Sequence, residues 1–100
     1  MVEQIEYERI RLEIERLRVT VGMAGGPVLY DPRLSLVQYH LQQGNTGTTH
    51  GIVQGMRDNP AAALYGYALL RTHFLNNDMP ASALSIAREE HRFLRDVLGR

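Results

Sequence analysis

Cysteine and lysine are both missing from this sequence. Without cysteine the chain can form no disulfide, carries no thiolate nucleophile and cannot build a cysteine-based zinc or iron–sulfur site. Without lysine, all 11 basic residues are arginine, and no phosphate-binding loop of the lysine type can form. These two absences remove several common redox and nucleotide-binding chemistries.

The sequence also has no excess of either charge, because its 11 basic residues are balanced by 11 acidic ones. A neutral chain creates no long-range field that would attract a phosphate backbone or an anionic membrane. It also does little to keep copies of itself apart. The charge balance therefore argues against nucleic acid as a partner and leaves self-association open.

Long apolar runs are missing too. No run approaches the ~18 residues that a bilayer crossing needs, and the first residues, Met1–Glu6, are acidic. We therefore expect no membrane contact and a cytoplasmic location. The chain has 100 residues, 44% hydrophobic and 22% charged, which predicts one folded domain over residues 1–100.

Apolar residues near the amino end follow a helical period from Glu3 to Val21, with spacings that alternate between three and four. The side chains of this seam are Tyr7, Ile10, Ile14, Leu17 and Val21. A second line, formed by Ile5, Leu12 and Val19, adds apolar width beside it. The helix either packs within its own domain or forms a zipper with another chain. We take the seam as the candidate interface.

Capping residues place two further helices. Asp31–Pro32 predicts a helix from residue 32 to about 43, because the carboxylate can cap free N–H groups and proline fits the first turn. In the glycine- and threonine-rich stretch Gly44–Gly51, Thr48 or Thr49 is placed to cap a short helix that ends near Arg57. This stretch is either a flexible connector or an anion-binding loop.

The second half of the chain predicts a helical hairpin. Asp58–Asn59–Pro60 predicts the start of a helix by the same capping logic. The stretch Ala61–Leu75 that follows is apolar nearly all round, which indicates a central, buried helix. A tight turn precedes a last helix over Pro80–Leu98, which should lie antiparallel to it. The predicted fold is all-α: a compact bundle of four to five helices with an amphipathic N-terminal helix and a C-terminal helical hairpin.

The four histidines are the natural candidates for a metal site or a general base. None has a second ligand three or four residues away on its own helix face; they are His40, His50, His73 and His91. We interpret His91 as a hydrogen-bonded residue at the edge of the core. We therefore assign no catalytic residue, no metal ligand and no cofactor.

Arginines recur along the last helix as a candidate basic patch, Arg88, Arg92 and Arg95. Glu89 and Asp96 dilute its charge, so a solvated helix face, an acidic protein or a phosphate backbone would each fit.

No candidate residues have catalytic spacing, and the first helix carries much apolar surface. The sequence thus predicts a non-enzymatic module for protein–protein interaction and assembly, whose partner is itself or another helical protein. One alternative is a small helical nucleic-acid-associated regulatory protein that uses the arginines of the last helix. A third is a histidine-based ligand-binding or enzymatic domain.

Overall fold

The described part of the protein is helical apart from its turns. The computed structural model describes residues 2–20 and 31–98, and no residue in these ranges lies in a strand. The helices are α1 (Val2–Thr20), α2 (Pro32–Gln42), α3 (Thr46–Gln54), α4 (Pro60–Asn76) and α5 (Pro80–Leu98). The predicted all-α bundle with a C-terminal hairpin is thus confirmed.

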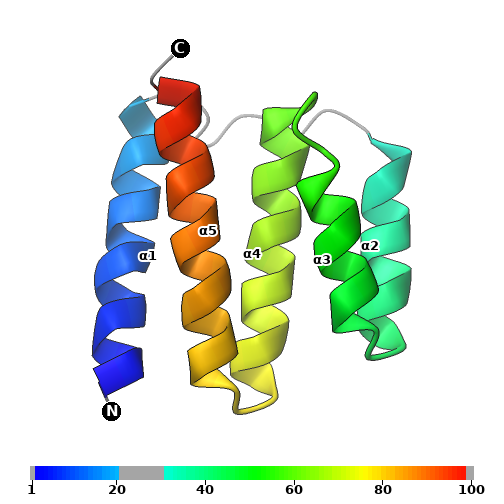
Figure 1. Ribbon diagram of the computed structural model, residues 1–100, viewed down its shortest axis with the longest axis horizontal. Helices are drawn as coiled ribbons and strands as arrows, with labels where there is room; N and C mark the ends of the chain where they lie inside the picture. The colour runs from blue at the N-terminus through cyan, green and yellow to red at the C-terminus, as the bar shows by residue number, and fades with distance from the viewer. Residues whose placement is uncertain (1, 21–30, 99–100) are drawn as a thin grey trace.

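The helices lie side by side in the order α1, α5, α4, α3, α2 (Figure 1). In this row α5 packs between α1 and α4, and α3 packs between α4 and α2, with α2 also contacting α4. The molecule measures 33 × 32 × 20 Å and is therefore flat. α4 is central, as predicted, while α1 and α2 lie at the two edges and each leave a face uncovered.

Capping begins α2 and α4 as the sequence predicts. The Asp31 carboxylate accepts a hydrogen bond from the backbone N–H of Arg33 at 3.0 Å, and Pro32 occupies the first turn. At α4 the Asn59 side chain accepts from the N–H of Ala62 at 3.4 Å. These short-range signals mark where the two helices start.

α3 begins earlier than predicted. It starts at Thr46, and Thr49 lies inside it, where its hydroxyl donates to the Asn45 carbonyl at 2.9 Å. This bond to the preceding turn replaces the predicted capping role of Thr48 or Thr49. Most of the stretch Gly44–Gly51 is therefore helical, and it is not the flexible connector that the sequence allowed.

α3 and α4 approach closely at a glycine. A Cβ atom added to Gly66 would lie 2.8 Å from Cγ2 of Val53, closer than real side-chain contacts allow. The missing side chain at Gly66 thus sets the spacing of the two helices.

The core is one connected cluster to which every described helix contributes, from Tyr7 in α1 to Leu94 in α5. None of the helices in residues 2–20 and 31–98 combines the length and the apolar character that a bilayer crossing requires. The apolar residues of these helices serve mainly to pack them on one another.

Candidate functional site

The side chains of the seam that we predicted as an interface are buried within the chain itself. Tyr7, Ile14 and Leu17 are only 3%, 1% and 7% exposed, and Ile10 packs at the edge of the same core. The helix that covers them is α5. Val21, the last residue of the predicted seam, lies outside the described residues. The described part of the seam is therefore a core face of the chain.

The second apolar line of α1 lies opposite the seam, not beside it. At roughly 100° per residue, the line points about 180° away from the buried side chains. Its members Ile5, Leu12 and Val19 are 71%, 57% and 63% exposed. Among the described helices α1 packs on α5, on the other side. We call this line the outward face of α1, and it is the largest uncovered apolar feature of that helix.

A buried polar network connects α1 with α4 and α5. Arg71 of α4 donates through Nε to Glu90 Oε1 at 2.7 Å and through Nη1 to the Tyr7 hydroxyl at 3.1 Å. Glu90 is 0% exposed, and its Oε2 has no hydrogen-bond partner within the part of the chain that the structure describes. Burial raises the pKa of Glu90, and the nearby Arg71 guanidinium offsets only part of that shift. The network is almost entirely buried, and it joins α1, α4 and α5.

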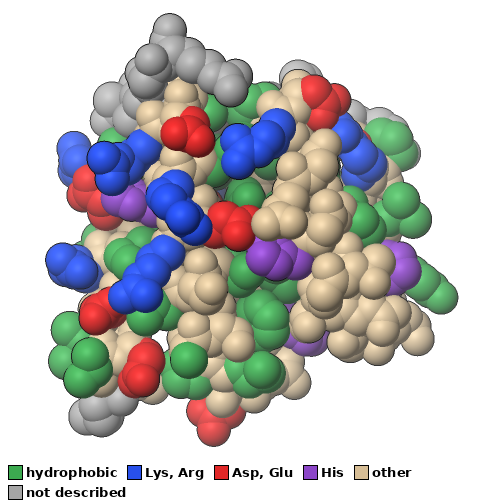
Figure 2. Space-filling model, in the orientation of Figure 1, with side chains coloured by type: hydrophobic (Ala, Val, Ile, Leu, Met, Phe, Trp, Pro, Cys, Tyr) green, Lys and Arg blue, Asp and Glu red, His purple; other side chains and the backbone are tan. Residues whose placement is uncertain are grey.

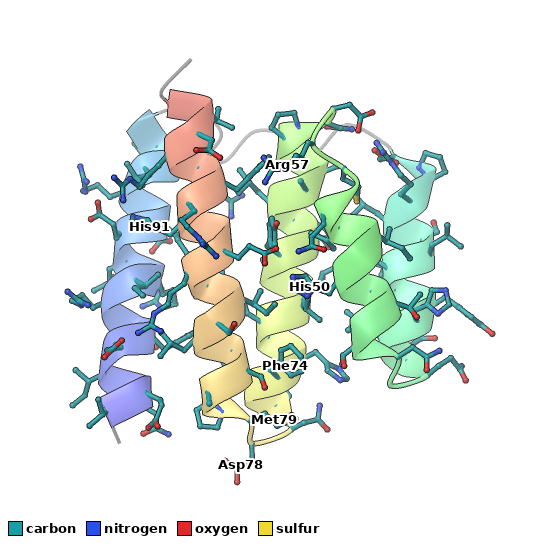
Figure 3. All side chains as sticks on the ribbon, in the orientation of Figure 1. His50, Arg57, Phe74, Asp78, Met79 and His91 are labelled. Atoms are coloured by element: carbon teal, nitrogen blue, oxygen red, sulfur yellow. The ribbon has the colours of Figure 1, made fainter. Side chains whose placement is uncertain are left out.

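A second polar cluster gathers around Glu89 of α5, between α3 and α4. Its carboxylate accepts from the Tyr67 hydroxyl at 2.7 Å, from His50 Nε2 at 2.9 Å and from Gln54 Nε2 at 3.3 Å. Figure 3 shows His50 in the space between α3 and α5. Burial alone would raise the pKa of Glu89, but the hydrogen bonds from Tyr67 and His50 hold it below its usual value. Glu89 is therefore a carboxylate at neutral pH, with its oxygens already in use.

The sequence did not predict this cluster. His50 and Glu89 are 39 residues apart, so no helical spacing relates them. Only the packing of α3 against the hairpin brings the imidazole to the carboxylate. Within the described residues no group of three or more acidic or histidine side chains is arranged to hold a metal ion.

The predicted basic patch lies on the exposed side of α5. Arg88, Arg92 and Arg95 are all exposed, and Arg88 forms an ion pair with Glu6 of α1. Figure 2 shows acidic side chains among the arginines on this side of the molecule. The patch is therefore mixed in charge, and part of it serves to fix α1 to α5.

The other histidines sit at helix surfaces and edges. His40 contacts the ring of Tyr39 and the side chain of Asn45, and His73 contacts the ring of Phe74. His91 is half-buried, but its Nε2 has no hydrogen-bond partner among the described residues, contrary to the hydrogen bond expected from the sequence. None of these three is part of a polar cluster comparable to that of His50.

Two features thus stand out: the outward face of α1 and the cluster around Glu89. No protein-family model, curated protein or solved structure matches this chain.

Proposed function

We propose that the protein is an assembly module that forms a homodimer through the outward face of α1. The observation that carries the proposal is the exposure of Ile5, Leu12 and Val19 on a helix whose other face is already buried. Apolar side chains that recur every seven residues form a line suited to a second helix with the same repeat. A second copy of α1 carries this repeat by definition.

Charges beside the line select the relative direction of the two helices. Glu8 and Glu15 lie about 50° to one side of the line, and Arg9 and Arg16 lie about 50° to the other. In a parallel pair the acidic side of each helix faces the basic side of its partner, along both edges of the interface. In an antiparallel pair acid would meet acid and base would meet base. The charges therefore favour a parallel dimer with its two-fold axis along α1.

The acidic side chains can accept these contacts while they keep their present ones. Arg11 lies 3.0 Å from Glu8 and 3.5 Å from Glu15, yet both carboxylates remain mostly exposed. Arg9 forms no ion pair with a described residue. A partner helix would thus meet mostly exposed carboxylates on one side of its apolar line and Arg9 on the other.

An isologous pairing of this kind stops at two copies, because each outward face is covered by that of the other copy. The interface is narrow, with Ile5, Leu12 and Val19 as its apolar layers and Val2 at its end, so we expect a dimer of moderate affinity. The opposite edge of the molecule, where Leu36 and Tyr39 of α2 are also exposed, is not needed for it.

Cysteine cross-linking tests both the interface and its direction. The natural chain has no cysteine, so one introduced thiol reports on one position. In the parallel dimer Ile5→Cys chains should form a disulfide with each other. In an antiparallel pair centred on Leu12 the two thiols would be about 21 Å apart along the axis, far beyond the ~7 Å Cα limit for a disulfide.

Leu36→Cys is the matched control, because Leu36 is an exposed leucine on the edge helix α2. Rapid cross-linking of Ile5→Cys, well above this control, supports the proposal. Cross-linking only between Ile5→Cys and Val19→Cys chains would contradict the parallel direction. Cross-linking no faster than that of Leu36→Cys would overturn the dimer.

A further inference from the structure

We infer that the groove between the end of α3 and the outer half of α5 is a binding site for a phosphate group, either free or on a small phosphomonoester. The groove is open to solvent on one side and has a volume of about 420 Å³, within the size range of small-ligand sites. Its lining residues are Gln54, Arg57, Glu89, Arg92, Phe93 and Asp96. It lies on a different part of α5 from the face that packs on α1, so the inference does not rest on the dimer.

Two guanidinium groups line the cavity and remain available. Arg57 is held above the ring of Phe93, with 5.3 Å between its guanidinium carbon and the ring centroid. Its nearest carboxylate, Asp96, is 3.9 Å away, at the outer limit of an ion pair. Arg92 is exposed and forms no ion pair with any residue that the structure describes. Arginine is the side chain best suited to bind phosphate oxygens in pairs.

Two carboxylates line the cavity, Glu89 and Asp96, and Glu89 is already held by other groups. The Glu89 carboxylate accepts hydrogen bonds from Tyr67, His50 and Gln54, and these three donors partly compensate its negative charge. Asp96 is mostly exposed at the rim. The site therefore offers two arginines to an anion, and Asp96 is the group that competes with it for Arg57.

This competition gives the proposal a sharp test. Nuclear magnetic resonance titration with inorganic phosphate, against chloride at equal ionic strength, should shift signals of Arg57 and Arg92 with a single Kd. Arg57→Gln or Arg92→Gln should raise that Kd about tenfold or more, since each removes charge-assisted hydrogen bonds. Asp96→Asn should lower it severalfold, because the rival carboxylate is gone.

Arg95→Gln is the matched control, since it removes an exposed arginine of the same helix that does not line the cavity. An unchanged Kd in this variant supports the site. Equal weakening in Arg95→Gln and Arg92→Gln would show diffuse attraction of anions and overturn it. Weaker binding in Asp96→Asn, or no shift with phosphate in the natural chain, would overturn it as well.

A second titration separates the sources of the phosphate. A single-stranded oligonucleotide should bind more weakly than a phosphomonoester such as glycerol phosphate, because each phosphodiester carries one charge where a phosphomonoester carries up to two, and the cavity is lined by two arginines, Arg57 and Arg92. Tighter binding of the oligonucleotide, reduced by Arg95→Gln, would instead assign the arginines to a nucleic-acid backbone and contradict the proposal.

Discussion

Replacing Gly66 by alanine should destabilise the protein, although alanine is the better helix former. The added Cβ would lie 2.8 Å from Cγ2 of Val53, and Val53 is 1% exposed and has a stiff, β-branched side chain. Overpacking of this kind lowers the free energy of unfolding by about 1–3 kcal/mol, while the higher helix propensity of alanine raises it by about 0.5–1 kcal/mol. We expect a net loss of about 1–2 kcal/mol, which lowers Tm by roughly 5–15 °C in a domain of this size.

Gly51 supplies the matched control, because it lies inside α3 and a Cβ there would meet nothing within 4 Å. Gly51→Ala should therefore raise Tm by roughly 2–8 °C. Thermal unfolding followed by circular dichroism measures both variants. In addition, Val53→Ala should relieve the clash, so that the double variant loses about 1 kcal/mol less than the two single losses added together. A Gly66→Ala variant as stable as the natural chain would refute the close approach of α3 and α4.

Two further predictions concern charged groups in the fold. Glu90→Ala leaves Arg71 buried without its carboxylate, so urea unfolding should show a loss of about 3–5 kcal/mol, and Glu90→Leu combined with Arg71→Met should recover most of it. Hydrogen bonds from the Arg33 side chain and backbone hold the pKa of Asp31 well below its usual range. The stability that Asp31 contributes is therefore present above the unfolded pKa of about 3.9 and is lost as the pH falls below it. Acid titration by circular dichroism should accordingly show Asp31→Asn less stable at pH 7 and less sensitive to acid than the natural chain.

Helix positions could be predicted from the sequence because their signals are local. The Asp31–Pro32 and Asn59–Pro60 caps act within one turn, and both appear in the structure. Local signals do not decide the role of Thr49, because a threonine can either cap a helix or donate to a carbonyl of the preceding turn. The position in which α3 packs decides between the two.

The candidate sites could not be predicted in the same way. Two apolar lines run along α1, and periodicity does not say which of them the fold covers; the position of α5 decides it. The cluster of His50, Tyr67 and Glu89 depends on contacts across three helices, which no spacing within one helix can reveal.

We propose that the outward face of α1 joins two copies of the chain. Size-exclusion chromatography with light scattering, over a tenfold range of concentration, tests it most directly. We predict a molar mass that approaches twice 11.3 kDa for the natural chain at the upper end of that range. Leu12→Glu should give a folded monomer, and the matched variant Leu36→Glu should remain a dimer. A natural chain that stays at 11.3 kDa throughout, or a Leu12→Glu variant that remains a dimer, would contradict a dimer formed through this face.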